Sequence, residues 1–164
     1  GVNYYNPMRV AAAGEDAELP FDFRDVLGHG VTDLDWPIVP EALREWLIMF
    51  RARFRAALPP IVITESGAAY NTEPDEAGVV EDQARIEYLD LHVRAVAEAI
   101  SRGVDIRGYY CWSFIDNFEW VEGLVPRFGL VHVNYQTLER TPKKSFQWYA
   151  DLIAAQPSAT GDDS

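Results

Sequence analysis

A single carboxylate, Glu65, follows an apolar, strand-like segment in the string PPIVITESGAAY, residues 59–70. A carboxylate at the end of a strand can cap a loop, bind a metal ion or act in catalysis. No basic residue lies within several positions of it, so the sequence does not suggest a local salt bridge. Glu65 is therefore a candidate catalytic group, and loop capping is the structural alternative for this segment.

A second segment, WSFIDNFEW at residues 112–120, combines aromatic and acidic side chains. Sugars present apolar C–H faces that lie against aromatic rings, and hydroxyl groups that pair with carboxylates. The alternative is an apolar loop that packs as core. The side chains that favour a sugar site are Trp112, Phe114, Asp116, Phe118, Glu119, Trp120 and, further along, Phe128.

Other kinds of site find less support. The three histidines show no metal-ligand spacing with acidic residues, so we expect no metal site and no cofactor. Neither Ser66 nor Ser113 has a nearby histidine, and Cys111 falls within an expected strand, where a thiol is buried and inert. What remains is carboxylate chemistry on a sugar, in which two carboxyl groups flank a glycosidic bond.

The composition limits the kinds of domain and the binding partners that the chain can have. The 164 residues are 48% hydrophobic, enough for one domain with a core, and the net charge of -12 argues against nucleic acid and anionic membranes as partners. One cysteine excludes an intrachain disulfide, and no run approaches the roughly 20 apolar residues of a membrane span. The start without Met suggests part of a larger protein, so the lack of a visible signal peptide carries little information. A cytoplasmic location is the expectation.

The elements that would position these residues alternate between strand and helix. We expect strands at residues 1–5, 61–64 and 104–114, a further short strand within 128–135, and an irregular segment at 8–39. Helices are expected from Pro40 to about Leu58, from Glu81 to Arg102 and from an N-cap at Thr141 to about Ala155, with a disordered tail at 156–164. Apolar residues at spacings of three and four lie on one face of the first helix: Leu43, Trp46, Leu47, Phe50, Phe54 and Leu58. The same spacing places Ile86, Leu89, Val93, Val96 and Ile100 on the buried side of the second helix, and Phe146, Tyr149, Ala150 and Ile153 on that of the third.

This order is typical of a parallel α/β fold, either doubly wound or a (β/α)8 barrel. No glycine-rich phosphate turn follows the first strand, which argues against a dinucleotide fold. The strands end in Tyr5, Glu65 and Trp112, and in a barrel such strand ends form one rim where sites are built. A barrel has eight units and about 250 residues, so the sequence predicts part of one.

The strings VITESGAAY, GYYCWSFIDNFEWVEGLVPRFGLVHVNY and RTPKKSFQWYADLI resemble the C-terminal part of family 1 glycoside hydrolases of the β-glucosidase type. GVNYYNP is similar to that family's sixth strand, and TDLDWPIVPEAL to the loop and helix after it. The resemblance covers residues 1–155 and implies strands six to eight of a TIM barrel. Ser66 stands where the family usually has Asn.

The resemblance also implies roles. Glu65 would be the catalytic nucleophile of a retaining β-glycosidase, and Tyr5 the tyrosine that hydrogen-bonds and orients it. The implied substrate is a β-glycoside or small oligosaccharide of neutral sugars, because Glu119 stands where relatives acting on 6-phosphosugars hold the phosphate. The residues expected to bind the sugar or its aglycone are Asn3, Trp36, Trp112, Glu119, Trp120 and Phe128.

The family's acid/base is a Glu in an Asn-Glu-Pro motif, and this string does not occur in the 164 residues. The sequence therefore predicts a chain that carries the nucleophile, lacks the acid/base and needs the N-terminal part of a barrel to complete its site. Two alternatives stay open: a non-catalytic sugar-binding relative, and a thioglucosidase whose acid/base position holds another residue.

Overall fold

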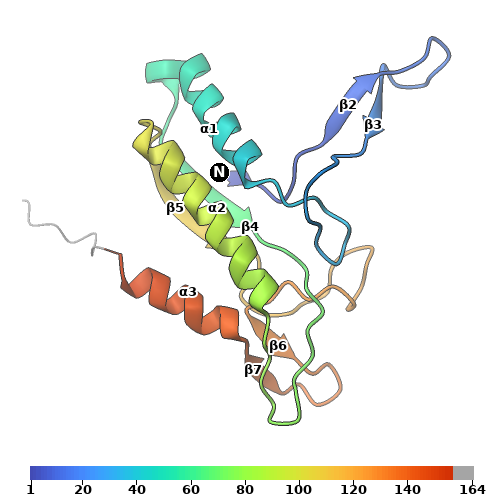
Figure 1. The fold of residues 1–164 in the computed structure, drawn as a ribbon, viewed down its shortest axis with the longest axis vertical. Helices are drawn as coiled ribbons and strands as arrows, with labels where there is room; N and C mark the ends of the chain where they lie inside the picture. The colour runs from blue at the N-terminus through green and yellow to red at the C-terminus, as the bar shows by residue number, and fades with distance from the viewer. Residues whose placement is uncertain (157–164) are drawn as a thin grey trace, which may run out of the picture.

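The computed structural model describes residues 1–156, and a parallel sheet lies at its centre (Figure 1). The predicted tail, residues 156–164, falls outside the described residues except for Gln156. In chain order the elements are β1 (Val2–Asn3), β2 (Arg9–Ala12), β3 (Phe21–Arg24), α1 (Pro40–Phe54) with a 3-10 turn (Arg55–Ala57), β4 (Ile61–Ser66), α2 (Gln83–Ser101), β5 (Ile106–Cys111), β6 (Val131–Val133), β7 (Arg140–Pro142) and α3 (Lys144–Ala154).

The central sheet has the strand order β1-β4-β5, and both pairs of neighbours are parallel. Helices α1 and α2 lie side by side against it, and α3 lies beside the lower part of α2 in Figure 1. Because β1 and β4 run parallel, their carboxyl ends meet at one edge, with Asn3 opposite Glu65. The sheet therefore delivers both residues to the same place.

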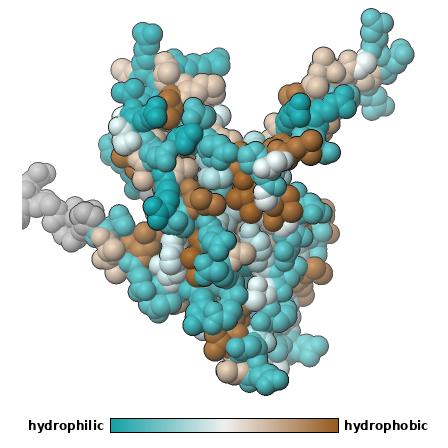
Figure 2. All heavy atoms as spheres, viewed as in Figure 1, coloured by the Kyte–Doolittle hydropathy of each residue, from teal (hydrophilic) through white to brown (hydrophobic). Residues whose placement is uncertain are grey.

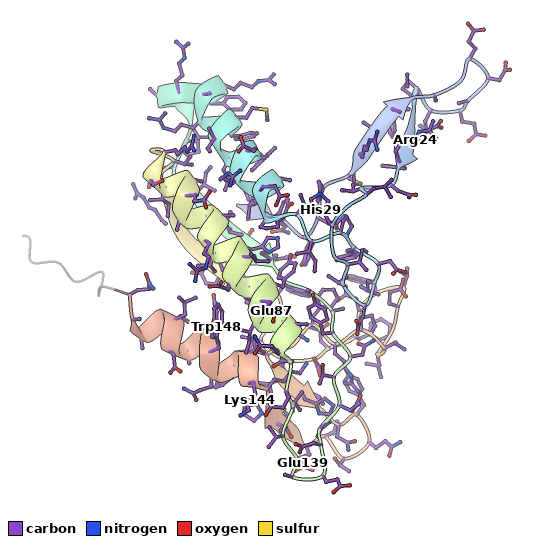
Figure 3. All side chains as sticks on the ribbon, in the orientation of Figure 1. Arg24, His29, Glu87, Glu139, Lys144 and Trp148 are labelled. Carbon is purple, nitrogen blue, oxygen red and sulfur yellow. The ribbon has the colours of Figure 1, made fainter. Side chains whose placement is uncertain are left out.

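Apolar side chains from both helices and the sheet form the main core. Leu43 and Leu47, one turn apart on α1, are fully buried, as the helical spacing predicted. They pack with Ile61 and Ile63 of β4. A second cluster contains Ala68, Tyr70, Tyr88, Leu89 and Leu130, and Trp148 of α3 packs against it from the side that faces α2 (Figure 3).

The buried side of α2 differs from the prediction. Ile100 was expected to be buried and is 47% exposed, and Ile86 and Val93 are only half-buried. The prediction considered apolar residues alone, whereas Arg85 and His92 face the interior and find hydrogen-bond partners there. The side of the helix that packs is Arg85, Tyr88, Leu89, His92, Ala95, Val96 and Ala99.

Two other expectations are wrong. Residues 8–39 are not wholly irregular, because β2 and β3 form an antiparallel hairpin that stands away from the sheet as an arm. Thr141 does not cap the last helix: it pairs with His132 in the β6–β7 ladder, and α3 begins at Lys144. Of the predicted apolar side of α3, Ala150 and Ile153 are exposed, and Figure 2 shows apolar surface beside α3 and at the root of the arm.

Candidate active site

Glu65 lies near the carboxyl end of β4 and is half-buried. Its carbonyl oxygen accepts a hydrogen bond of 2.8 Å from the backbone N–H of Tyr4, which continues the pairing of β1 with β4. Asn3 stands opposite it, and the Asn3 side-chain oxygen accepts a hydrogen bond of 2.6 Å from the Thr64 hydroxyl. Within residues 1–156 the Glu65 carboxylate forms no salt bridge, so its charge is available for chemistry.

The hydroxyl of Tyr5 donates a hydrogen bond of 2.6 Å to Oε2 of Glu65. Burial raises the pKa of Tyr5 far above its usual value, and the Glu65 carboxylate raises it further. The phenol therefore keeps its proton and acts as the donor. A short hydrogen bond to a carboxylate fixes the orientation of that carboxylate.

The ring of Tyr5 packs with two aromatic rings from distant parts of the chain. The ring of Trp36 lies 5.5 Å from that of Tyr5 and 5.9 Å from that of Phe128, measured between centroids. The rings of Tyr5 and Phe128 are 6.2 Å apart and nearly perpendicular. The structure therefore brings together four of the predicted site residues, including Glu65, from four segments of the chain.

Trp112 directly follows β5 and joins the same edge of the sheet. Its backbone N–H donates a hydrogen bond of 3.0 Å to the carbonyl oxygen of Ser66, and the peptide bond between Trp112 and Ser113 is cis. Gly67 passes so close that a Cβ at this position would overlap the carbonyl oxygen of Trp112. The backbone after Glu65 and the backbone at Trp112 are thus in direct contact.

The two other predicted sugar-binding residues are placed differently. Glu119 is half-buried, its charge contributes to the raised pKa of Tyr5, and its buried Oε2 has no hydrogen-bond partner within residues 1–156. An acceptor without a partner suits the hydroxyl of a ligand. Trp120 is 85% exposed, and among the described residues it forms no aromatic pair. The structure leaves it at the surface, apart from the cluster around Tyr5.

Asp116 was one of the two acids expected to face a sugar, and this expectation is wrong. Its carboxylate is buried and accepts hydrogen bonds from the backbone N–H groups of Gly129 at 2.8 Å and Val133 at 3.3 Å. Two cations balance its charge: the ammonium group of Lys143 is 3.0 Å from Oδ1, and Nη1 of Arg127 is 3.6 Å from Oδ2. Burial lowers the pKa of Lys143 to about 8. Asp116 therefore holds the loop in place, and its buried carboxylate is paired with protein groups rather than left open for a ligand.

Other chemistry is not favoured by the geometry. No group of three or more potential metal ligands occurs in the described part of the chain. Burial raises the pKa of the Cys111 thiol to about 12, so it stays protonated and unreactive at neutral pH. None of the helices within residues 1–156 is long and apolar enough to cross a membrane.

Comparison with known proteins shows the family of this chain. The model of the family described as Glycosyl hydrolase family 1 matches residues 1–157. The chain is 43% identical over 159 residues to a β-glucosidase from Agrobacterium sp.. This match covers 96% of this chain and 34% of that protein. The chain is also 38% identical over 125 residues to a 6-phospho-β-galactosidase from Streptococcus equi subsp. zooepidemicus, covering 76% of this chain and 26% of that protein.

Among solved structures, a family 1 β-glucosidase from Thermotoga maritima matches with a TM-score of 0.85 and 38% identity, covering 93% of this chain and 33% of that one. Such enzymes are (β/α)8 barrels, so the parallel α/β fold predicted from the sequence is confirmed as part of such a barrel. The chain spans about a third of the length of the curated relatives it matches. The chain belongs to glycosyl hydrolase family 1.

Proposed function

We propose that residues 1–155 form the C-terminal part, strands six to eight, of the barrel of a retaining β-glycosidase. Three observations support this placement. The central strands are parallel and their chemically active residues lie at the carboxyl ends, which is where sites are built in (β/α)8 barrels. The sheet order β1-β4-β5 follows the chain order, as in a barrel. The matched relatives are about three times as long as the chain.

The single observation that carries the catalytic proposal is the hydrogen bond of 2.6 Å from Tyr5 to Glu65 inside a cluster of aromatic rings. In the proposed reaction Glu65 attacks the anomeric carbon of a β-glycoside and forms a covalent glycosyl ester. The bond from that carbon to the aglycone oxygen breaks, and an acid from outside this chain protonates the leaving oxygen. Water then cleaves that ester, and the sugar leaves with retained configuration. Tyr5 keeps the attacking oxygen oriented, and no cofactor takes part.

The sugar would lie between the aromatic rings and the carboxylates at this edge of the sheet. Trp112 gives it a flat apolar surface and Phe128 a side wall, while Trp36 flanks the aglycone. Asn3 and Glu119 supply hydrogen-bonding groups for hydroxyls, and the unpaired Oε2 of Glu119 is the best placed of these. Trp120, which is exposed here, would join the sugar's outer hydroxyls through its indole N–H once the rest of the barrel surrounds it.

The acid/base would come from a segment outside this chain, at about 5–5.5 Å from the carboxyl group of Glu65. We therefore expect the isolated 164-residue chain to release no nitrophenol from an aryl β-glucoside. Co-expression with the N-terminal two thirds of the Agrobacterium sp. β-glucosidase should restore release, and Glu65→Gln should abolish it. Activity of the chain alone, or restored activity that survives Glu65→Gln, would contradict the proposal.

The half-buried carboxylate of Glu119 favours a neutral sugar, because an acidic side chain beside a phosphate repels it. The alternative substrate is a 6-phosphorylated sugar, because one of the relatives is a 6-phospho-β-galactosidase. The complex of this chain with the N-terminal two thirds of the Agrobacterium sp. β-glucosidase is called the complemented enzyme below. We expect it to hydrolyse an aryl β-glucoside or β-galactoside better than the corresponding aryl 6-phospho-β-glycoside. The opposite preference would show that Glu119 does not face the sugar's sixth carbon.

A further inference from the structure

Arg85 lies in the first turn of α2, and its side chain is only 1% exposed. Its Nε donates a hydrogen bond of 2.8 Å to Oδ2 of Asp82, which is also fully buried. Asp82 in turn accepts hydrogen bonds from Ser145, at 2.9 Å from its backbone N–H and 2.6 Å from its hydroxyl. A buried ion pair is tolerated only when its polar atoms are satisfied, and here the pair is also fixed to the first turn of α3.

The rest of the guanidinium group binds backbone carbonyl oxygens of two separate segments. Nη1 donates to the carbonyl oxygens of Ala68 and Phe128, the latter at 3.0 Å. Nη2 donates to those of Tyr70 at 3.1 Å and Arg127 at 2.7 Å. The two segments also meet directly, because the backbone N–H of Tyr70 donates to the carbonyl oxygen of Arg127 at 3.2 Å. One buried cation thus joins two loops that are distant in sequence.

Both loops carry parts of the candidate active site. The first begins at Ala68, three residues after Glu65. The second ends in Phe128, whose ring packs against the rings of Tyr5 and Trp36. A displacement of Phe128 would therefore free the ring of Tyr5, whose hydroxyl holds the Glu65 carboxylate.

We propose that Arg85 is a positioning residue for the nucleophile. Its planar group of five N–H donors fixes Phe128 against Tyr5, and through Tyr5 it holds Glu65 in one orientation. Lysine cannot replace it, because a single ammonium group has three donors at one point and cannot reach carbonyl oxygens on both loops while also pairing with Asp82. That Arg85 holds Phe128 against Tyr5 does not depend on the proposed function. Only the effect of Arg85 on catalysis rests on the proposed function.

The test uses the full 164-residue chain with ¹³C-labelled tyrosine, and the Tyr5 ring resonances are assigned by their loss in Tyr5→Phe. The chemical shifts of Tyr5 report on the nearby Phe128 ring, because an aromatic ring shifts resonances in a way that depends on its position. We expect Arg85→Lys to move the Tyr5 resonances while circular dichroism shows the native helix content. Unmoved Tyr5 resonances in a folded Arg85→Lys variant would overturn the inference.

Val96→Ala is the matched control, since Val96 is buried on the same side of α2 but packs in the other core cluster, with Leu43 and Ile63, and not against either loop. It should lower stability and leave the Tyr5 resonances in place. Equal shifts in Val96→Ala would mean that any weakening of the core moves Tyr5, and the inference would fail. If Arg85→Lys does not fold, Asp82→Asn replaces it as the test variant. This substitution removes the charge that pairs with Arg85 and keeps Arg85 itself, and it should move the Tyr5 resonances. Unmoved Tyr5 resonances in a folded Asp82→Asn variant would then overturn the inference.

A second readout follows in the complemented enzyme. Arg85→Lys should lower kcat about tenfold at nearly unchanged KM, as expected when an interaction of the transition state alone is weakened. A wild-type complex without activity would refute the proposed function and leave the resonance experiment unaffected. A wild-type complex with activity that Arg85→Lys preserves in full would refute the positioning role.

Discussion

His92 is fully buried on α2, and its protonation should control the stability of the chain in mildly acidic solution. Its ring stacks on that of Tyr88 at 3.9 Å and lies 5.7 Å from that of Tyr4. Nδ1 donates a hydrogen bond of 2.7 Å to the carbonyl oxygen of Tyr88, and Nε2 has no partner within residues 1–156. A second proton would therefore place a charged N–H in the core without an acceptor.

Burial lowers the pKa of His92 to about 4 from its ordinary value of 6.5, although the backbone hydrogen bond and the charge of Glu41 on α1 act in the opposite direction. Between these two values the unfolded chain binds the proton and the folded chain does not. The free energy of unfolding therefore falls as the pH is lowered from 6.5 to 4. At about 1.4 kcal/mol per pKa unit, the loss attributable to His92 is about 3 kcal/mol.

The assay is urea unfolding of the wild type and of His92→Gln at several pH values between 4 and 7. Other titrating groups affect both proteins alike, so the difference between the two curves isolates His92. Val96→Ala provides the control, because it removes buried carbon atoms from the same helix and no titrating group, so it should lower the free energy of unfolding by a similar amount at every pH. Parallel curves for the wild type and His92→Gln would refute the reasoning.

Two further predictions concern the site itself. Gly67→Ala should lower the free energy of unfolding by about 2–4 kcal/mol, because the new Cβ overlaps the carbonyl oxygen of Trp112. Gly14 has open space around it, so Gly14→Ala should change the free energy of unfolding by less than about 0.5 kcal/mol. Thermal unfolding compares the two, and equal effects would disprove the close contact. Tyr5→Phe in the complemented enzyme should lower kcat about 10- to 100-fold, since it removes a hydrogen bond to the charged Glu65. Unchanged kcat would mean that the hydrogen bond has no role in the reaction.

The parts of the fold that were predicted correctly depend on local patterns. Leu43 and Leu47 recur at the helical spacing, and both are buried as expected. The apolar segment 61–64 forms most of β4, and Glu65 follows it at the carboxyl end of the sheet. Hydrophobic spacing and turn residues were sufficient here because the environment of each position is set by its near neighbours.

The parts that were missed depend on partners far away in the sequence. Arg85 is buried because its guanidinium group reaches carbonyl oxygens 15 to 43 residues distant. Asp116 is buried because Lys143, 27 residues later, neutralises it. From the sequence alone Asp116 was expected to face a sugar, and nothing marked Arg85 as buried. Only the folded chain supplies the groups that offset the desolvation of these two charges.

The arm formed by β2 and β3 was missed for another reason. Its strands are four residues each and remain largely exposed. β2, RVAA, has no alternation of apolar and polar residues, and in β3, FDFR, the alternation is too short to mark a strand by itself. The site cluster of Tyr5, Trp36 and Phe128 was expected from the family resemblance rather than from spacing. Its geometry, including the perpendicular packing of the rings, required the structure.

The central claim is that Glu65 is a catalytic nucleophile whose acid/base partner lies outside this chain. Its most direct test is to incubate the complemented enzyme with a 2-fluoro-β-glucoside that carries a good leaving group, and to map the labelled peptide by mass spectrometry. We predict one sugar attached to Glu65, and no label in Glu65→Gln. A label on another residue, or none in an active complex, would contradict the account.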